Sequence, residues 1–174
     1  MNDDVGILLL RVVIGLLIAG HGVQKVSFRL GGKGLQGGID EFKADGFRGG
    51  AFTALAAGLG QIGSGLLLAL GALTPLAAMA AIGVMTVAVT VKTGNGLWVQ
   101  HDGYEFPLVL ITVATALGFT GPGAYSVDAL LGIENPPLWA GTAALAVGVL
   151  AGLLMRVALH RGTPSAPDTR QGQA

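Results

Sequence analysis

The sequence has no cysteine and little charge, and both absences narrow the class of protein that it can encode. The lack of cysteine among 174 residues excludes disulfides, thiolate nucleophiles, cysteine-ligated iron–sulfur clusters and covalently attached c-type haem. Charged residues make up 11%, against about 25% in a soluble globular domain. Lysine plus arginine and aspartate plus glutamate are balanced at 10 each, so the basic patch of a nucleic-acid-binding protein is not expected.

Hydrophobic residues, in contrast, make up 52% of the chain, and the mean hydropathy is +0.68. A soluble globule of this composition would lack the polar surface that keeps it dispersed. Apolar runs that approach the ~20 residues needed to cross a bilayer cover residues 5–26, 51–73, 75–91, 104–120 and 136–159. The fourth run is at the short limit for a span, so its helix could begin earlier. We therefore predict an all-α integral membrane helical bundle.

Two connections between the runs contain further predicted elements. The glycine-rich residues 27–50 include an amphipathic segment, residues 39–47, which we expect to lie on the membrane surface with Phe42 on its apolar side. Residues 125–131 are expected to form a short interfacial helix, since tyrosine sits well at headgroup level. Residues 32–37 match the pattern G-x-G-x-x-G, but no strand precedes them, so we predict a flexible loop.

The basic residues are distributed unevenly between the two predicted membrane sides. With five spans, the side that carries the C-terminus holds nine of the ten cations. They are Lys25, Arg29, Lys33, Lys43, Arg48, Lys92, Arg156, Arg161 and Arg170. The tenth, Arg11, lies within the first helix. The positive-inside rule therefore predicts a cell-membrane protein with its N-terminus outside and its C-terminus in the cytoplasm.

Polar residues of the first run fall on one helix face. At 100° per residue, Arg11, His21 and Lys25 lie on a common stripe. Two readings of Arg11 stay open: its head snorkels to the outer surface, or it points into the bundle and hydrogen-bonds to Gln61. Lys25 either anchors the helix at the interface or joins a functional cluster.

Gln61, near the middle of the second run, should face protein, because its amide would be unpaired in hydrocarbon. Small residues recur at every fourth position in the second and fifth runs, which favours close helix packing. They are Ala56, Gly60 and Ser64, and Ala144, Gly148 and Gly152.

The connection before the fourth run supplies two more candidates, His101 and Glu105. The predicted topology places them on the same side as His21 and Lys25, where the four could form a polar cavity that relays protons or orients a quinone carbonyl. In the alternative, each group contacts water or headgroups independently. The third histidine, His160, ends a helix, so the positions of the histidines do not favour a bis-histidine haem, and we predict no metal site.

Several segments, taken in order and spacing, resemble the DoxX family of membrane proteins. They are Leu9-Leu10-Arg11, His21-Gly22-Val23-Gln24-Lys25, Gly71-Ala72-Leu73-Thr74, Gly103-Tyr104-Glu105-Phe106-Pro107 and Gly121-Pro122-Gly123-Ala124-Tyr125-Ser126-Val127-Asp128. The resemblance covers about residues 5–132 and implies the four-helix core of a prokaryotic cytoplasmic-membrane protein. Some relatives are small subunits of thiosulfate:quinone oxidoreductase, and others are linked to oxidative-stress complexes. Such families usually have Glu where this chain has Gln61 and Arg where it has Pro75, so a membrane proton carrier is missing here.

These observations predict a DoxX-like four-helix core in residues 1–132, an additional transmembrane helix in 133–160 and a disordered polar tail in 161–174. We interpret the chain as the membrane component of a quinone-linked redox system, of the thiosulfate:quinone oxidoreductase or oxidative-stress type. The residues assigned to its functional cluster are Arg11, His21, Lys25, His101 and Glu105. Without a recognisable electron carrier of its own, such a protein would need either partner subunits or a bound cofactor that the sequence does not reveal. The sequence does not decide whether the protein forms a homo-oligomer or whether it is an enzyme. The alternative is a non-enzymatic membrane scaffold or small-molecule permeation protein.

Overall fold

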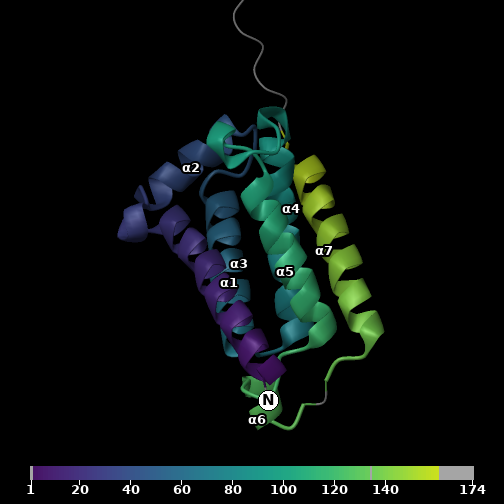
Figure 1. Cartoon of the computed structure of the whole chain (residues 1–174). Helices are drawn as coiled ribbons and strands as arrows, with labels where there is room; N and C mark the ends of the chain where they lie inside the picture. Colours follow the sequence, from purple (N-terminus) through teal and green to yellow (C-terminus); the bar gives the residue numbers. More distant parts are fainter. Residues whose placement is uncertain (1, 134, 161–174) are drawn as a thin grey trace, which may run out of the picture.

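The computed structural model describes residues 2–133 and 135–160, and the elements of this part of the chain are helices. Five long helices run side by side (Figure 1): α1 (Asn2–Val26), α3 (Ala51–Leu70), α4 (Thr74–Lys92), α5 (Glu105–Thr120) and α7 (Leu138–Leu159). The short helix α2 (Gly34–Ala44) lies at one end of this bundle, and α6 (Val127–Leu130) lies at the other. We call these the α2 end and the α6 end. The predicted all-α bundle is confirmed.

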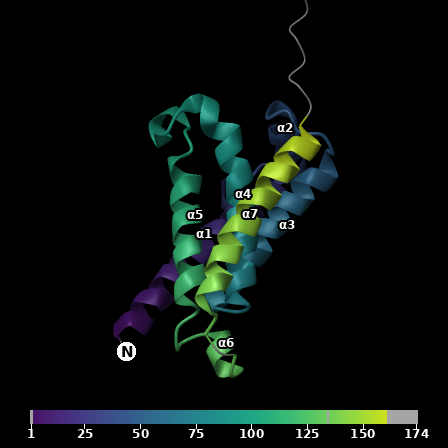
Figure 2. The same cartoon turned by 90° about the vertical axis from the view of Figure 1, so that its right-hand side faces the viewer.

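The helices have the length and composition of membrane spans. Four of them, α1, α3, α4 and α7, are long and apolar enough to cross a bilayer. Helix α5 has 16 residues, or about 24 Å at 1.5 Å per residue, and it begins no earlier than its apolar run. It nevertheless runs alongside α4 from one end of the bundle to the other (Figure 2). The chain is therefore a multi-pass membrane protein.

Local sequence signals explain where these helices begin and end. Helix α3 is terminated by the following residue, Gly71, which adopts the left-handed conformation with φ of 63°, and Pro75 occupies the first turn of α4. The division between the predicted runs 51–73 and 75–91 is confirmed. The predicted helix within 125–131 is also present as α6, which Ser126 caps by accepting a hydrogen bond from the Ala129 N–H at 3.1 Å.

Glycine allows two pairs of helices to pack with their backbones in contact. A Cβ atom at Gly65 of α3 would lie 2.5 Å from the Gly15 carbonyl oxygen of α1. A Cβ atom at Gly148 of α7 would lie 2.7 Å from the Met79 carbonyl oxygen of α4. No side chain fits at such distances, so these contacts require the small residues that membrane helix interfaces favour.

The small-residue predictions therefore have different outcomes on the two helices. On α7, the predicted residues Ala144, Gly148 and Gly152 are buried. On α3 the predicted face is confirmed only in part, because Ser64 is buried and Gly60 is half-buried but Ala56 is exposed. The contact with α1 is made by Gly58 and Gly65. These two glycines are seven residues apart, which is close to two full turns of a helix with 3.6 residues per turn, so they face the same side. Two steps of four residues overshoot two turns and drift around the helix.

Helix α2 corrects one further prediction and shows how its apolar side chains pack. It begins at Gly34, within the segment 32–37 that we expected to be a flexible loop. Its Phe42 side chain is buried and packs edge-on against Phe47, with 5.5 Å between the ring centroids. The apolar face of α2 is therefore turned toward the bundle. The predicted disordered tail, 161–174, lies outside the described residues.

Candidate functional site

Lys25, at the C-terminal end of α1, is held by α2. Its Nζ donates to Glu41 Oε1 at 2.8 Å and lies 5.1 Å from the centre of the Phe42 ring. The ion pair and the cation–π contact together fix the ammonium group between the two helices. In this structure, Lys25 joins α1 to α2.

His101 and Glu105 do not share a helix face. Helix α5 begins at Glu105, and the exposed His101 lies in the preceding 3₁₀ turn, Val99–His101. Between them, Asp102 adopts a left-handed conformation with φ of 57°, which interrupts the helix. Glu105 Oε2 accepts a hydrogen bond from the Val99 N–H at 3.0 Å. The prediction of an earlier start to this helix is therefore wrong, and Glu105 organises its own loop.

His21 of α1 is half-buried and faces α5. Its Nδ1 lies 2.9 Å from the Leu17 carbonyl oxygen, which can only accept, so Nδ1 carries the hydrogen and Nε2 is the acceptor of the neutral ring. The imidazole centroid is 5.2 Å from that of Phe106, the residue after Glu105. The helices carrying His21 and Glu105 are thus neighbours, as the predicted cavity requires.

The four predicted residues of the α2 end are nevertheless not joined to one another. Within residues 2–133 and 135–160, no hydrogen bond or ion pair connects any two of His21, Lys25, His101 and Glu105. Lys25 binds Glu41, Glu105 binds the Val99 N–H, and His21 Nδ1 contacts the Leu17 carbonyl oxygen. The structure therefore brings His21 next to α5, but the four side chains do not form a cluster in direct contact with one another.

Arg11 lies in a separate place, ten residues before His21 and about 15 Å away along α1. Its side chain is only 2% exposed. Nη1 donates to the Ala69 carbonyl oxygen at 2.7 Å, and Nη2 donates to the carbonyl oxygen of Tyr125. Arg11 thus points into the bundle, and the expected hydrogen bond to Gln61 is replaced by two backbone partners near the α6 end.

Asp128 is a buried acid that the sequence reasoning did not select. Its carboxylate accepts hydrogen bonds from the Leu73 N–H at 2.8 Å, the Thr74 N–H at 3.1 Å and the Thr74 hydroxyl at 2.9 Å. It therefore caps α4 from a distant segment and supplies negative charge that acts on Arg11. The sequence signal that could have identified Asp128 is that it is a lone acid in the otherwise apolar stretch 127–131.

Around these two charges, four parts of the chain meet in what we call the Arg11–Asp128 centre, formed by Arg11, Gly71, Thr74 and Asp128. Gly71 is required there, because its φ is 63° and a Cβ atom would lie 2.6 Å from Arg11 Nη1. The Asp128 N–H donates to the Gly71 carbonyl oxygen at 3.0 Å. The centre therefore ties α1, α3, α4 and α6 together.

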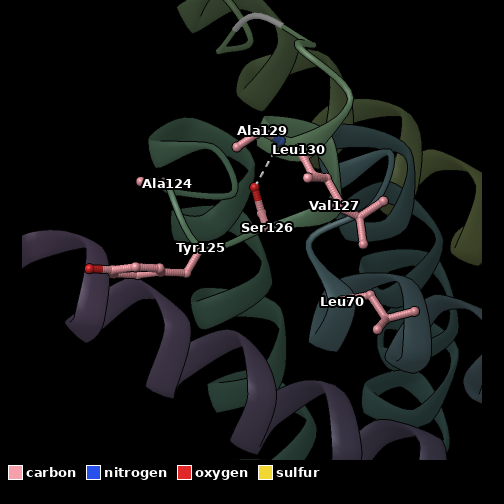
Figure 3. Close-up of a pocket in the computed structure, with 7 residues that line it drawn as sticks. All are labelled: Leu70, Ala124, Tyr125, Ser126, Val127, Ala129 and Leu130. Carbon is pink, nitrogen blue, oxygen red and sulfur yellow. Dashed lines mark hydrogen bonds between the residues drawn. The ribbon is translucent and has the colours of Figure 1, made fainter.

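Two cavities lie beside the Arg11–Asp128 centre. One, of about 440 Å³, is lined by Leu70 and by residues of the α6 segment (Figure 3). In this view Tyr125 extends across α1, whereas Ser126 points toward the Ala129 N–H. The other, of about 390 Å³, lies between α4 and α7 and is largely apolar, with Asp128 and Trp139 among its lining residues. Both lie toward the α6 end, away from His21.

Gln61 is 4% exposed, so the prediction that it faces protein is confirmed. Its Oε1 atom is buried and accepts no hydrogen bond from the described part of the chain. The neighbouring Ser64 hydroxyl donates to the Gly60 carbonyl oxygen at 2.7 Å. Gln61 is therefore an interior polar group with an unused acceptor.

Part of the chain matches a known protein family. Residues 6–94, just over half of the chain, match the family model described as DoxX. The matched segment begins within α1, contains α2 to α4 and ends before α5, so it is shorter than the resemblance expected over 5–132. No curated protein and no solved structure matches the chain.

Proposed function

The chain belongs to the DoxX family, and on that premise we propose that it is the membrane component of a quinone-linked redox system. The observation that carries this proposal is the His21–Phe106 pair, which combines a proton-accepting nitrogen with an aromatic surface near the end of a membrane helix. A membrane quinone has the complementary parts, a planar ring and oxygen atoms that exchange protons.

The residues fit such a ligand in chemical type. His21 Nε2 would accept a proton from a hydroxyl, and the protonated ring would donate to a carbonyl oxygen. Phe106 is 36% exposed, which leaves ring surface for stacking. Lys25, one turn after His21, is positioned by Glu41, while Glu105 holds the loop that leads into α5. These contacts keep the His21–Phe106 pair in place.

Electron transfer would involve a second protein. A bound quinone supplies two-electron, two-proton chemistry, and a partner subunit with a flavin or metal carrier would deliver or receive the electrons. In this scheme, the DoxX chain provides the membrane site and the proton acceptor. We also propose that residues 1–132 form the core, that 133–160 add a further membrane helix and that the α2 end faces the cytoplasm.

Histidine NMR tests the site directly, because the chain has only three histidines. In protein labelled with ¹⁵N-histidine, titration with a short-chain ubiquinone should shift the His21 ring signals saturably and leave His101 unchanged. Phe106→Ala should weaken this binding by about three- to tenfold, as expected for the loss of one aromatic contact. Phe119→Ala is the matched control, since Phe119 is 37% exposed on the same helix. A His21 signal that does not respond would contradict the proposed site.

A scaffold or small-molecule permeation role is the second candidate, and one observation favours it. Lys25, Glu105, Arg11 and Asp128 each bind a partner within the protein, as expected for groups that stabilise a fold. Gentle purification followed by mass spectrometry and absorbance spectroscopy separates the two functions. Co-purifying redox subunits with a flavin or haem spectrum support the redox role, whereas partners without redox cofactors support the scaffold.

A further inference from the structure

We propose that residues 28–33, which connect α1 to α2 and which we call the 28–33 turn, bind the headgroups of anionic phospholipids. This inference is independent of the quinone proposal, because it concerns a different surface. It rests on the rigidity of the turn, its exposed apolar side chains and its two cations.

The turn is held in one conformation by hydrogen bonds. Gln24 Nε2 donates to the Leu30 carbonyl oxygen at 2.7 Å, and the Arg29 N–H donates to the Ser27 hydroxyl at 3.2 Å. The Gly34 N–H donates a hydrogen bond to the Ser27 carbonyl oxygen at 3.1 Å, which closes the loop. Leu30 has φ of 53°, a strained conformation for a branched side chain. These contacts maintain the strain and fix the direction in which Leu30 projects.

Two apolar side chains of this turn are largely exposed, although Leu30 also packs on α1, where a Cβ atom at Gly20 would lie 3.6 Å from Leu30 Cδ1. Phe28 is 83% exposed and Leu30 is 65% exposed. The Phe28 ring covers Gly34, where a Cβ atom would lie 2.6 Å from Phe28 Cζ, so one ring face packs and the other is open. Figure 1 shows the start of α2 at the edge of the molecule, away from α3, α4, α5 and α7. The exposed side chains can therefore enter lipid without disturbing the bundle.

The two cations of the turn have no acidic partner in the described part of the chain. Arg29 and Lys33 are exposed, and neither side chain forms a hydrogen bond or ion pair there. Lys25, by contrast, is paired with Glu41. Arg29 and Lys33 are thus available for an anionic group outside the protein.

The length of α1 places this turn at headgroup depth. Its 25 residues span about 37 Å, more than the ~30 Å of bilayer hydrocarbon. At this level, Phe28 and Leu30 would contact acyl chains while Arg29 and Lys33 reach phosphate oxygens. The combination favours a lipid with net negative charge over a zwitterionic one.

Native mass spectrometry of the full chain in mild detergent tests this proposal. Wild-type protein should bind phosphatidylglycerol about tenfold more tightly than phosphatidylcholine with the same acyl chains, and inorganic phosphate should not displace the lipid. The double variant R29Q/K33Q should lose about fivefold in phosphatidylglycerol affinity for each cation removed. The charge-preserving variant R29K/K33R should retain the wild-type preference. If the double variant does not fold, R29Q and K33Q are measured singly.

Lys43→Gln is the matched control, because it removes an exposed cation from α2 without altering the turn. It should change phosphatidylglycerol affinity less than twofold. An equal loss in this control, or a wild-type protein without a preference for phosphatidylglycerol, would overturn the proposal. Displacement of the lipid by inorganic phosphate would also overturn it.

Discussion

Asp128 shows at the residue scale how one buried carboxylate can organise an end of a membrane bundle. It accepts from two backbone N–H groups and one hydroxyl, which together satisfy the start of α4. Leu73, immediately before α4, has φ of 49°, an unfavourable conformation for leucine. The hydrogen bond from the Leu73 N–H to Asp128 offsets this cost and holds the α3–α4 turn closed.

Replacement of Asp128 by alanine should therefore destabilise the protein strongly. Two buried donors of Thr74 and the partly buried Leu73 N–H would lose their acceptor, and Arg11 would lose a nearby opposite charge, for a total of about 2–4 kcal/mol. The measurement is the thermal midpoint in detergent. Asp40→Ala is the control, because Asp40 is exposed on α2 and pairs with Gln36. Equal midpoints for the two variants would show that Asp128 does not stabilise the α3–α4 turn.

The partners of Arg11 could not be predicted from its own neighbourhood. Angular arithmetic placed Arg11 on the stripe with His21, and this face does point inward. Its acceptors, the carbonyl groups of Ala69 and Tyr125, are 58 and 114 residues away in sequence. Every residue has a backbone carbonyl, so no side-chain pattern marks which ones a buried guanidinium will reach.

At the scale of the elements, helix pairing depends on glycine contacts whose exact residues matter. Gly65 of α3 would place a Cβ atom against the backbone of α1, with 2.5 Å to Ala19 N, whereas Gly63 has no atom within 4 Å of that position. The two glycines share one helix and differ only in the direction that they face. Substitution of Gly63 is therefore a control for substitution of Gly65 within the same helix.

Gly65→Ala should separate α1 from α3, because backbone atoms cannot yield as a flexible side chain can. The expected cost is about 1–3 kcal/mol from overpacking. Gly63→Ala should be neutral or slightly stabilising, since alanine has the higher helix propensity. Unfolding followed by circular dichroism in mixed micelles measures both variants. A similar response of the two variants would contradict the close α1–α3 contact.

The turn after α2 contains a carboxylate in an unfavourable environment. Partial burial, reinforced by the charge of Glu41, raises the pKa of Asp45 above its ordinary value, although Lys25, Lys92 and Arg156 act in the opposite direction. Its backbone carbonyl also accepts a hydrogen bond from Arg156 Nη1 at 2.9 Å, which links the end of α2 to α7. The charge of Asp45 is thus close to an interhelical contact.

Asp45→Asn should stabilise the protein at neutral pH relative to the wild type. Because the folded pKa lies above the unfolded one, the folded state binds more protons between these two values, and stability falls as pH rises through that window. The variant should lose this part of the pH dependence, which thermal midpoints between about pH 4 and 7 would reveal. Asp40→Asn serves as the exposed control. If the advantage of Asp45→Asn were greater in acid than at neutral pH, the sign of the shift would be wrong.

Much of the element order was predictable, and the exceptions have physical causes. Gly71 and Pro75 mark the α3–α4 break because they suit a left-handed cap and a first helical turn. The position of α2 was less predictable, since Phe42 can cover either lipid or protein with the same apolar ring. Its contact with Phe47 is a tertiary fact that α2 alone does not specify.

At the scale of the whole molecule, the predicted site is divided between two ends. The Arg11–Asp128 centre lies at the α6 end, while His21, Lys25, His101 and Glu105 belong to the α2 end. Apolar periodicity predicts which helices exist, but it does not determine the side-chain partners made where their ends meet. The membrane assignment was therefore accessible from composition, whereas the division of polar groups required the fold.

The final prediction concerns the orientation of the whole bundle in the membrane. Of the eight basic residues in the described part of the chain, seven belong to the α2 end, so this end should face the cytoplasm. Green fluorescent protein fused after Ala174 should fluoresce, and alkaline phosphatase at the same position should be inactive. A matched phosphatase fusion after Gly132, between α6 and α7, should be active because it would lie outside. Phosphatase activity after Ala174 would contradict the orientation, and fluorescence from fusions at both positions would mean that α7 does not cross the membrane.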